Sequence, residues 1–228
     1  MTIRGKENKT LNMNLTSNQD LIKQLEWRYA VKKFDPQKKI SEPDWQTIEK
    51  SLVLTPSSYG LQPWKFIVVQ SPELRKKLKP ISWNQTQVED CSHYVVFANK
   101  IDLNEKYIED FISLNSQVRN VSKEKLESYK KMMIGDLLNG ERKDRLSEWA
   151  TRQCYIALGN LMTTVAVMGI DACPMEGIEP QKYDEVLELE GSGYQTCVAC
   201  AVGYRSAGDF YSKLAKVRFS AEQVIIHK

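Results

Sequence analysis

Basic and hydroxyl-bearing residues gather in four short segments of the chain, each at the end of an expected helix or strand. The segments are residues 28–32 (Arg-Tyr-Ala-Val-Lys), 56–64 (beginning Pro-Ser-Ser), 174–177 (Pro-Met-Glu-Gly) and 216–218 (Lys-Val-Arg). Cationic side chains, hydroxyls and free backbone N–H groups in loops are the donors that a phosphate dianion needs. A turn such as 174–177 offers backbone along which a flat ring can lie. Together the segments predict a site for a planar, phosphorylated cofactor.

Each segment taken alone has a simpler interpretation. Arg28 and Lys32 are four residues apart, a spacing that is also typical of a solvated helix face. The Pro-Ser-Ser and Pro-Met-Glu-Gly sequences are common in ordinary loops and turns. Lys216 and Arg218 could be an ordinary surface pair, and a tryptophan such as Trp64 is more often a core residue than a cofactor platform.

Composition and charge exclude several classes of protein. The chain has 228 residues with 32 Lys and Arg against 29 Asp and Glu, so its formal charge is +3. This near-neutral balance gives no support for a protein that binds nucleic acid or a membrane surface. With 42% hydrophobic and 27% charged residues, the composition is typical of a globular protein with a sizeable core.

Histidine is too rare for most metal or triad chemistry. The chain has only His93 and His227, so it cannot build a multi-histidine metal site, and we expect no metal. A Ser-His-Asp triad would have to use His93, which lies in the apolar stretch SHYVVFA. If the protein is an enzyme, the difficult chemistry is therefore expected to belong to a cofactor.

The cysteines predict reduced thiols. The chain has five, an odd number, and they lie in apolar sequence, which favours a cytoplasmic protein over a disulfide framework. Cys197 and Cys200 form a C-x-x-C within a strand-like run. Because positions three apart on a strand point to opposite faces, we interpret them as core residues and not as a redox or metal pair.

Hydrophobic periodicity and capping signals predict alternating helices and strands. Helices are expected at 17–31, 41–55, 72–79, 144–168 and 180–189, with two more across 104–139 separated at Ser122. Strands are expected at 65–70, 93–99, 170–173 and 196–204, and the C-terminal SAEQVIIHK could add an edge strand. This order indicates a layered α/β or α+β fold in one domain, residues 17–228, after a flexible tail at 1–16.

The sequence suggests neither a targeting segment nor a membrane span. The polar N-terminus lacks the apolar run of a signal peptide, which again favours the cytoplasm. The longest apolar run, about residues 149–170, contains Arg152 and Asn160. We therefore expect a buried core helix and not a membrane span.

In their order and spacing, the four segments resemble the FMN-dependent nitroreductase family. The resemblance is strongest to the branch of oxygen-insensitive NAD(P)H nitroreductases and dihydropteridine reductases. It covers about residues 20–219 and rests on R-x-x-x-K-x-F-D, P-S-S-x-x-x-Q-P-W, P-x-E-G and the long helix that carries Gly-Asn-Leu at 159–161. It implies an α+β fold, a three-layer α/β/α sandwich with a mostly antiparallel sheet, in an intertwined homodimer with two FMN sites at the interface.

The resemblance also implies roles for particular residues. Arg28, Lys216 and Arg218 would clamp the FMN phosphate. Lys32 and Asn84 would reach the pyrimidine side of the ring. The 174–177 turn would line the ring, while the Pro-Ser-Ser loop would come from the partner subunit. The complete expected set is Arg28, Tyr29, Ala30, Lys32, Pro56, Ser57, Ser58, Gly60, Asn84, Gln87, Pro174, Met175, Glu176, Gly177, Lys216 and Arg218.

The reaction that the resemblance implies has two half-reactions. NADH or NADPH gives a hydride to flavin N5, and a nitroaromatic, quinone or pterin then takes the electrons in a ping-pong cycle. No side chain is expected to act as a nucleophile, and the Glu176 backbone would lie near N5. The alternatives are a non-catalytic flavin-binding dimer and a generic α/β binding protein without flavin.

Three positions depart from close relatives. Gln87 stands where they carry a second lysine at the flavin edge, Ala30 where they carry a serine, and Gly60 where they carry an asparagine. The missing lysine predicts a lower flavin potential. Residues 129–138, YKKMMIGDLL, correspond to a substrate lid, and their methionines and glycine predict an adaptable one. The alternative for that segment is a solvated helix with some apolar contacts.

Overall fold

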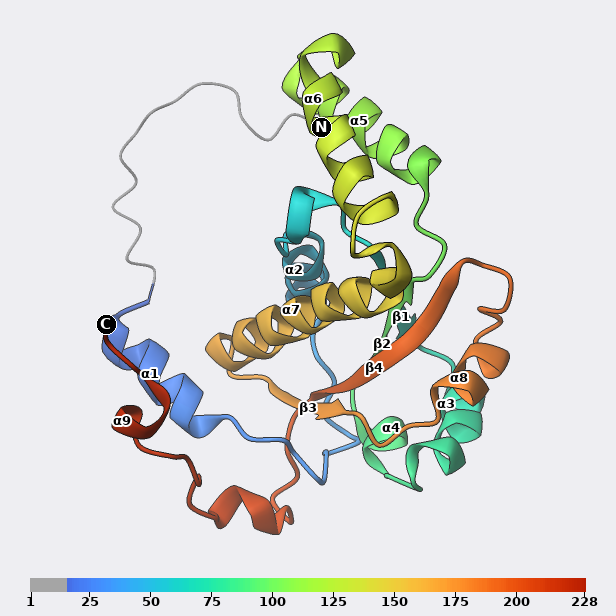
Figure 1. The fold of residues 1–228 in the computed structure, drawn as a ribbon. Coiled ribbons are helices and arrows are strands. Elements are labelled where there is room, and N and C mark those ends of the chain that lie inside the picture. Colours follow the sequence, from blue (N-terminus) through green and yellow to red (C-terminus); the bar gives the residue numbers. More distant parts are fainter. Residues whose placement is uncertain (1–15) are drawn as a thin grey trace.

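The computed structural model describes residues 16–228, and Figure 1 shows the path of the chain. The tail expected at 1–16 therefore lies, apart from Thr16, outside the described residues. No helix in the described part of the chain is long and apolar enough to cross a membrane.

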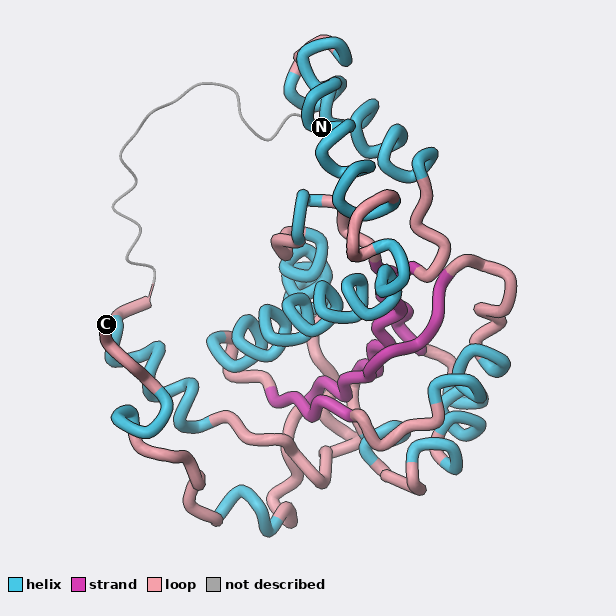
Figure 2. The backbone as a smooth tube through the Cα atoms, viewed as in Figure 1, coloured by secondary structure: helices cyan, strands magenta, loops and turns pink. Residues whose placement is uncertain are grey.

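A four-stranded sheet forms the middle layer. Its strands are β1 (Trp64–Val69), β2 (His93–Lys100), β4 (Tyr194–Gly203) and β3 (Asp171–Met175), hydrogen-bonded in that order. All three strand pairs are antiparallel. Residues of β2 after His93 are buried, as expected for a strand covered on both faces. Figure 2 shows the strands, in magenta, between helices.

Helices cover both faces of the sheet. On one face α7 (Leu146–Val167) and α2 (Glu42–Val53) pack through apolar residues such as Leu161 and Trp45. On the other face lie α3 (Pro72–Leu78), α4 (Gln87–Asp90) and α8 (Pro180–Val186), with Leu78 and Tyr183 fully buried beneath them. The expected α+β, three-layer arrangement is confirmed, and the apolar run at 149–170 is the core helix α7.

A helical pair stands apart from these layers. It consists of α5 (Glu105–Arg119), α6 (Lys123–Met133) and a π-helical turn, Ile134–Leu138, that continues α6 (Figure 1). Ser122 precedes α6, as the sequence predicts. The pair has its own apolar cluster, in which Ile108, Met133 and Leu137 are fully buried.

Two sequence expectations are wrong at the ends of the chain. The first helix, α1 (Asn18–Trp27), stops before the expected residue 31, because the following residues run extended beside β3. Ala30 bridges Ala172 there, and the Val31 N–H donates to the Ala172 carbonyl. The C-terminal segment forms a short helix, α9 (Ala221–Val224), and not an edge strand, because Ser220 and Gln223 make a capping box.

The cysteines are free thiols, as expected. The expectation that Cys197 and Cys200 point to opposite faces of their strand is wrong. The β2–β4 register shifts between Phe97 and Ala98, which leaves Cys197 without a partner in the ladder. This bulge places Cys197 and Cys200 in the same apolar cluster beneath α7 and not on opposite faces. The two remain core residues without a disulfide. The Cys154 thiol lies in the same cluster, and its hydrogen bond with Cys197, together with burial, raises its pKa.

His93 is a packed residue at the start of β2. Its ring stacks on Trp45 with centroids 3.8 Å apart, and its Nδ1 lies 3.0 Å from the Ser92 hydroxyl. Burial, with a smaller effect of Arg75, lowers the pKa of His93 to about 4. The neutral ring is thus the form that the fold accommodates.

This pKa predicts an acid-sensitive fold. The unfolded chain protonates His93 near its ordinary pKa of 6.5 and the folded chain only near 4, so folding stability should fall as the pH drops through that window. We expect His93→Phe, which keeps the stacking on Trp45, to flatten this dependence in urea unfolding at pH 7 and pH 5. His227→Phe, at the exposed end of the chain, is the control. Equal pH dependence in native protein and His93→Phe would contradict the assignment.

Candidate cofactor site

A pocket of about 560 Å³ opens between the end of α1 and the chain that follows β4. The structure brings together here six of the residues singled out in the sequence. They are Arg28, Tyr29, Ala30, Lys32, Lys216 and Arg218. Two segments at opposite ends of the chain therefore share one wall. The simpler interpretation of Arg28 and Lys32 as one helix face is wrong, since both follow α1.

The pocket concentrates positive charge. Burial, followed by the nearby guanidinium groups of Arg28 and Arg218, lowers the pKa of Lys216. The Lys216 ammonium group donates a hydrogen bond to the Arg28 carbonyl oxygen. Glu26 is the one acidic side chain among the described residues that line the pocket. Such a donor set fits a phosphate dianion, which would relieve the mutual repulsion of the cations.

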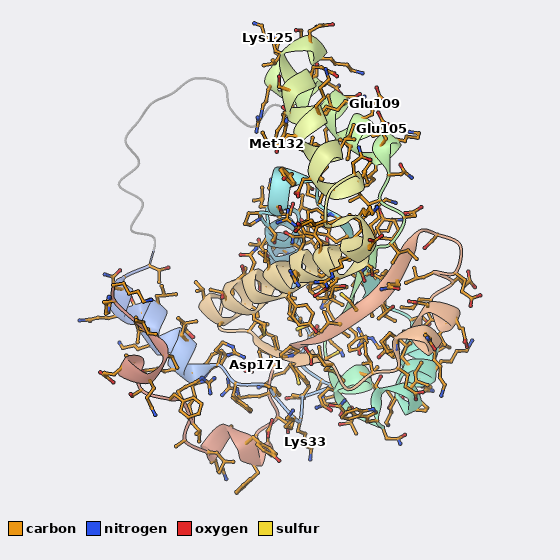
Figure 3. The ribbon with its side chains drawn as sticks, viewed as in Figure 1. Lys33, Glu105, Glu109, Lys125, Met132 and Asp171 are labelled. Carbon is orange, nitrogen blue, oxygen red and sulfur yellow. The ribbon has the colours of Figure 1, made fainter. Side chains whose placement is uncertain are left out.

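Arg205 is a further cation of this pocket, and sequence reasoning missed it. Its guanidinium group lies over the rings of Trp27 and Tyr29, at 4.0 and 4.5 Å from their centroids. Its Nε donates to both carboxylate oxygens of Asp171, at 2.9 and 3.0 Å. Asp171 is 3% exposed and begins β3 (Figure 3). No local pattern marks this pair, because 34 residues separate its members.

Asp209 fixes the backbone that carries the predicted cations. Its carboxylate is buried and accepts hydrogen bonds from the N–H groups of Lys32 and Lys33, at 2.8 and 3.0 Å, and from the Tyr29 hydroxyl at 3.1 Å. Burial alone would raise the pKa of Asp209, but these hydrogen bonds outweigh it and lower the pKa. Burial raises the pKa of Tyr29 to about 12, so its hydroxyl remains a donor.

The 174–177 turn and the 83–87 segment lie side by side at the end of β3. Gln85 Nε2 donates to the Gly177 carbonyl at 3.1 Å, and a Cβ on Gly177 would come within 2.8 Å of the Trp83 ring. Asn84, between those residues, is exposed and has a φ of 55°. The Tyr155 hydroxyl of α7 donates to Glu176 at 2.5 Å. The turn is thus tied to both helical layers.

Gln87 and Cys173 connect this turn with the cation pocket. Gln87 is 5% exposed, and its side chain lies close to the Cys173 thiol of β3. Burial raises the pKa of Cys173, while Lys32 and Gln87 act in the opposite direction. Lys32 and Gln87 therefore both lie close to Cys173. Pro174 and Met175 follow directly along the strand, with Met175 buried.

The Pro-Ser-Ser loop is not among the residues that line this pocket. It follows α2, where the Ser58 N–H donates to Gln153 Oε1 at 2.8 Å and the Gln62 N–H donates to Ser57 Oγ at 2.9 Å. Pro56 and Gly60 belong to the same loop, which Figure 1 shows on the other side of α7 from the chain after α1. Within one chain, the residues expected to bind the cofactor are therefore divided between the side of α7 that holds the cation pocket and the side that holds the Pro-Ser-Ser loop.

The expected lid, residues 129–138, is only partly available to a substrate. Met133 and Leu137 are buried in the cluster of the α5–α6 pair, whereas Met132 is exposed (Figure 3). Tyr129 is half-buried and its hydroxyl donates to the Tyr59 carbonyl at 2.7 Å. The adaptable character predicted for the segment thus applies to one of its two methionines.

Comparison with known structures identifies the fold. A crystal structure from Exiguobacterium sibiricum, in complex with FMN, has a TM-score of 0.75 at 21% identity and covers 93% of this chain and 98% of that one. The crystal structure of CLA-ER, described as an enone reductase of gut-bacterial fatty acid saturation, also has a TM-score of 0.75. It is 25% identical and covers 93% of this chain and 99% of that chain.

Sequence comparison identifies the family. The model of the nitroreductase family matches residues 25–204. The protein named "Putative NAD(P)H nitroreductase SERP2086" of Staphylococcus epidermidis is 38% identical over 223 residues, which are 91% of this chain and 96% of that protein. The family model includes the end of α1 and the 174–177 turn, and it ends before Arg205, Lys216 and Arg218 of the cation pocket. The chain belongs to the nitroreductase family.

Proposed function

We propose that the protein is an FMN-dependent NAD(P)H oxidoreductase. The observation that carries the proposal is the crowding of Lys216 with Arg28 and Arg218 in a pocket beside the start of β3. Five guanidinium and ammonium groups line the pocket, one of them paired with Asp171, and such a set favours an anion with more than one charge. The family membership and the names of relatives support FMN, whose phosphate group would be this anion, and NAD(P)H as the reductant.

The residues of one chain would hold FMN in two ways. Arg28, Lys216 and Arg218 would bind the phosphate. The 174–177 turn, whose Gly177 leaves room only for a hydrogen at Cα, would present backbone to the ring. Lys32 and Gln87 would lie at its pyrimidine edge.

The divided position of the expected residues supports a homodimer. Ser57 and Ser58 do not line the cation pocket of their own chain, so they would complete the site of a second copy. In the proposed dimer each chain contributes a phosphate clamp to one site and a hydroxyl-bearing loop to the other. The active unit would then contain two equivalent FMN sites.

When bound, FMN supplies reversible hydride transfer at N5, reduced by NAD(P)H in one half-reaction and reoxidised by an organic acceptor in the next. The chain would orient both reactants, and no side chain would need to become covalently bound. A nitroaromatic, quinone or pterin is the proposed acceptor. The enone reductase among the related structures adds activated alkenes to these candidates.

A non-catalytic flavin-binding dimer is the alternative function. An oxidoreductase and a non-catalytic flavin-binding dimer would both be yellow. Colour alone therefore distinguishes these two only from a generic binding protein without flavin. Bleaching of the flavin absorbance by NADH or NADPH, followed by its return on addition of a quinone, would establish the oxidoreductase. A yellow protein that neither nicotinamide bleaches would favour the alternative.

Arg218→Ala tests the phosphate clamp. A hydrogen bond to a charged group contributes about 1.5–3 kcal/mol, so we expect the Kd for FMN to rise about ten- to a hundredfold. Because the substitution also relieves repulsion in the empty cluster, the FMN-free protein should unfold at the same or a higher urea concentration. Flavin fluorescence titration and urea unfolding measure the two effects.

Lys213→Ala is the matched control for that test, because Lys213 is exposed nearby but does not line the pocket. It should leave the Kd for FMN within about twofold. Unchanged FMN binding in Arg218→Ala would contradict the clamp.

Gln87→Lys tests the electrostatics at the ring edge. A cation there would favour the anionic reduced flavin, and a charge pair of about 1–3 kcal/mol corresponds to a rise of about 20–65 mV in the two-electron potential. Spectroelectrochemical titration against a dye of known potential measures the shift. Gln46→Lys, on the exposed side of α2, carries the same charge change and should leave the potential unaltered. A potential that does not rise in Gln87→Lys would refute the role of this position.

A further inference from the structure

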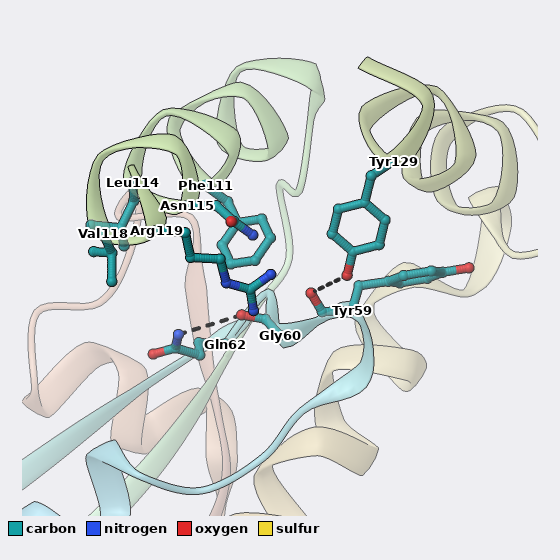
Figure 4. Close-up of a pocket in the computed structure, with 9 residues that line it drawn as sticks. All are labelled: Tyr59, Gly60, Gln62, Phe111, Leu114, Asn115, Val118, Arg119 and Tyr129. Carbon is teal, nitrogen blue, oxygen red and sulfur yellow. Dashed lines mark hydrogen bonds between the residues drawn. The ribbon is translucent and has the colours of Figure 1, made fainter. Parts of the chain in front are cut away.

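A second pocket lies between the α5–α6 pair and the loop that follows α2. It has a volume of about 440 Å³ and is distinct from the cation pocket at Arg28. Aromatic, apolar and polar side chains face it together (Figure 4). The residues that matter here are Tyr59, Gly60, Phe111, Asn115, Arg119 and Tyr129.

Arg119 gives this pocket an uncompensated positive charge. It is the last residue of α5 and is exposed, and no carboxylate of residues 16–228 lies within 4 Å of its guanidinium group. The acids earlier in α5 are engaged elsewhere, since Glu105 and Glu109 lie 3.7 and 3.5 Å from the ammonium group of Lys130 (Figure 3). The Arg119 donors are therefore available to an anion.

Asn115 provides a second, independent indication of a ligand. Its side chain lines the pocket and the residue is 8% exposed, yet its Oδ1 has no hydrogen-bond partner in the described part of the chain. Buried polar oxygens nearly always have a partner. An amide one helical turn from Arg119 thus offers hydrogen bonding that the protein itself does not use.

The remaining walls are preformed. Tyr59 has a φ of 57°, and its position is held at both ends: its carbonyl accepts from the Tyr129 hydroxyl at 2.7 Å, and its own hydroxyl donates to Asp136 at 2.7 Å. Gly60 has a φ of 70°, and a Cβ there would lie 3.4 Å from the Phe111 ring. The absence of a side chain at Gly60 leaves an open slot beside aromatic rings.

The pocket adjoins the loop assigned above to the flavin of the second copy. Tyr59 and Gly60 follow directly on Ser57 and Ser58. A ligand held by Arg119 would therefore lie beside that flavin and not beside the one clamped by its own chain. The inference below rests on the proposed function in this respect.

We propose that this pocket binds the carboxylate of an aromatic electron acceptor, so that Arg119 selects for anionic acceptors. A single cation matches a monoanion better than the diphosphate of a nicotinamide dinucleotide. The aromatic walls match a flat ring, and the volume is suited to a one-ring compound. The guanidinium group pairs with a carboxylate through two parallel hydrogen bonds, while Asn115 binds a further polar group of the same ligand.

4-Nitrobenzoate is a suitable probe, because its carboxylate takes no part in the reaction. In the first step the nitro group, NAD(P)H and one proton give the nitroso group, NAD(P)⁺ and water. One N–O bond breaks, the nitrogen is reduced by two electrons, and the nicotinamide is oxidised. 4-Nitrobenzamide undergoes the same step without a negative charge.

The test compares these two acceptors in native protein and in Arg119→Gln. We expect kcat/KM for 4-nitrobenzoate to fall about five- to twentyfold and that for 4-nitrobenzamide to change less than about twofold. The rate at which NADH bleaches the flavin should be unchanged. Lys125→Gln removes an exposed cation of α6 outside the pocket and should alter neither acceptor (Figure 3).

Saturation-transfer NMR can measure the binding of benzoate to the full chain with and without FMN. This measurement separates the inference from the proposed function. Arg119-dependent binding of benzoate, with no binding of benzamide, would support the pocket even in a protein that lacks redox activity. Equal losses for both acceptors in Arg119→Gln would overturn the inference, as would benzoate binding that survives the substitution. A slower reaction with NADH and unchanged acceptor kinetics would assign Arg119 to the dinucleotide and also overturn it.

Discussion

The buried carboxylate of Asp209 helps to hold together the two chain segments that form the candidate cofactor site. One segment runs from the end of α1 to Lys33 and the other follows β4, and neither belongs to the sheet. Asp209 accepts hydrogen bonds from the N–H groups of Lys32 and Lys33 in the first segment. It also accepts one from the Tyr211 N–H in the second segment, at 3.0 Å. Backbone hydrogen bonds join the same two segments, since the Asp35 N–H donates to the Tyr204 carbonyl and the Ser206 N–H to the Lys33 carbonyl, at 2.8 Å each. The pair of Arg205 with Asp171 acts in the same sense, because it anchors a further cation to β3.

The proposed cofactor site and the proposed acceptor pocket are built on different parts of the molecule. The cation pocket lies between the end of α1 and the chain after β4, and the 174–177 turn lies at the end of β3. The α5–α6 pair has its own apolar cluster, so substitutions on its outer side can alter the second pocket without disturbing the sheet. If the proposal holds, the acceptor pocket could change in sequence while the cofactor site stays the same.

The sequence predicted the layers well and the site in part. Strongly periodic segments such as α7 and the apolar strands follow from local patterns, and the cations at 28, 216 and 218 do meet in one pocket. Arg205, Asp171 and Asp209 escaped notice because their partners are remote in sequence and no spacing links them. The first helix was drawn too long because contact with β3 overrides local helical tendency at Ala30 and Val31. The capping box at Ser220 was a local signal that should have indicated α9.

The state of the cysteines has a consequence for the path of electrons. Burial raises the pKa of Cys91 to about 11 and also raises that of Cys200, while interaction with Cys197, followed by burial, raises that of Cys154. Protonated, enclosed thiols are poor nucleophiles and react slowly with peroxides and disulfides. In a flavoprotein that passes electron pairs to organic compounds, these three thiols would therefore react slowly with oxidants that the reaction produces.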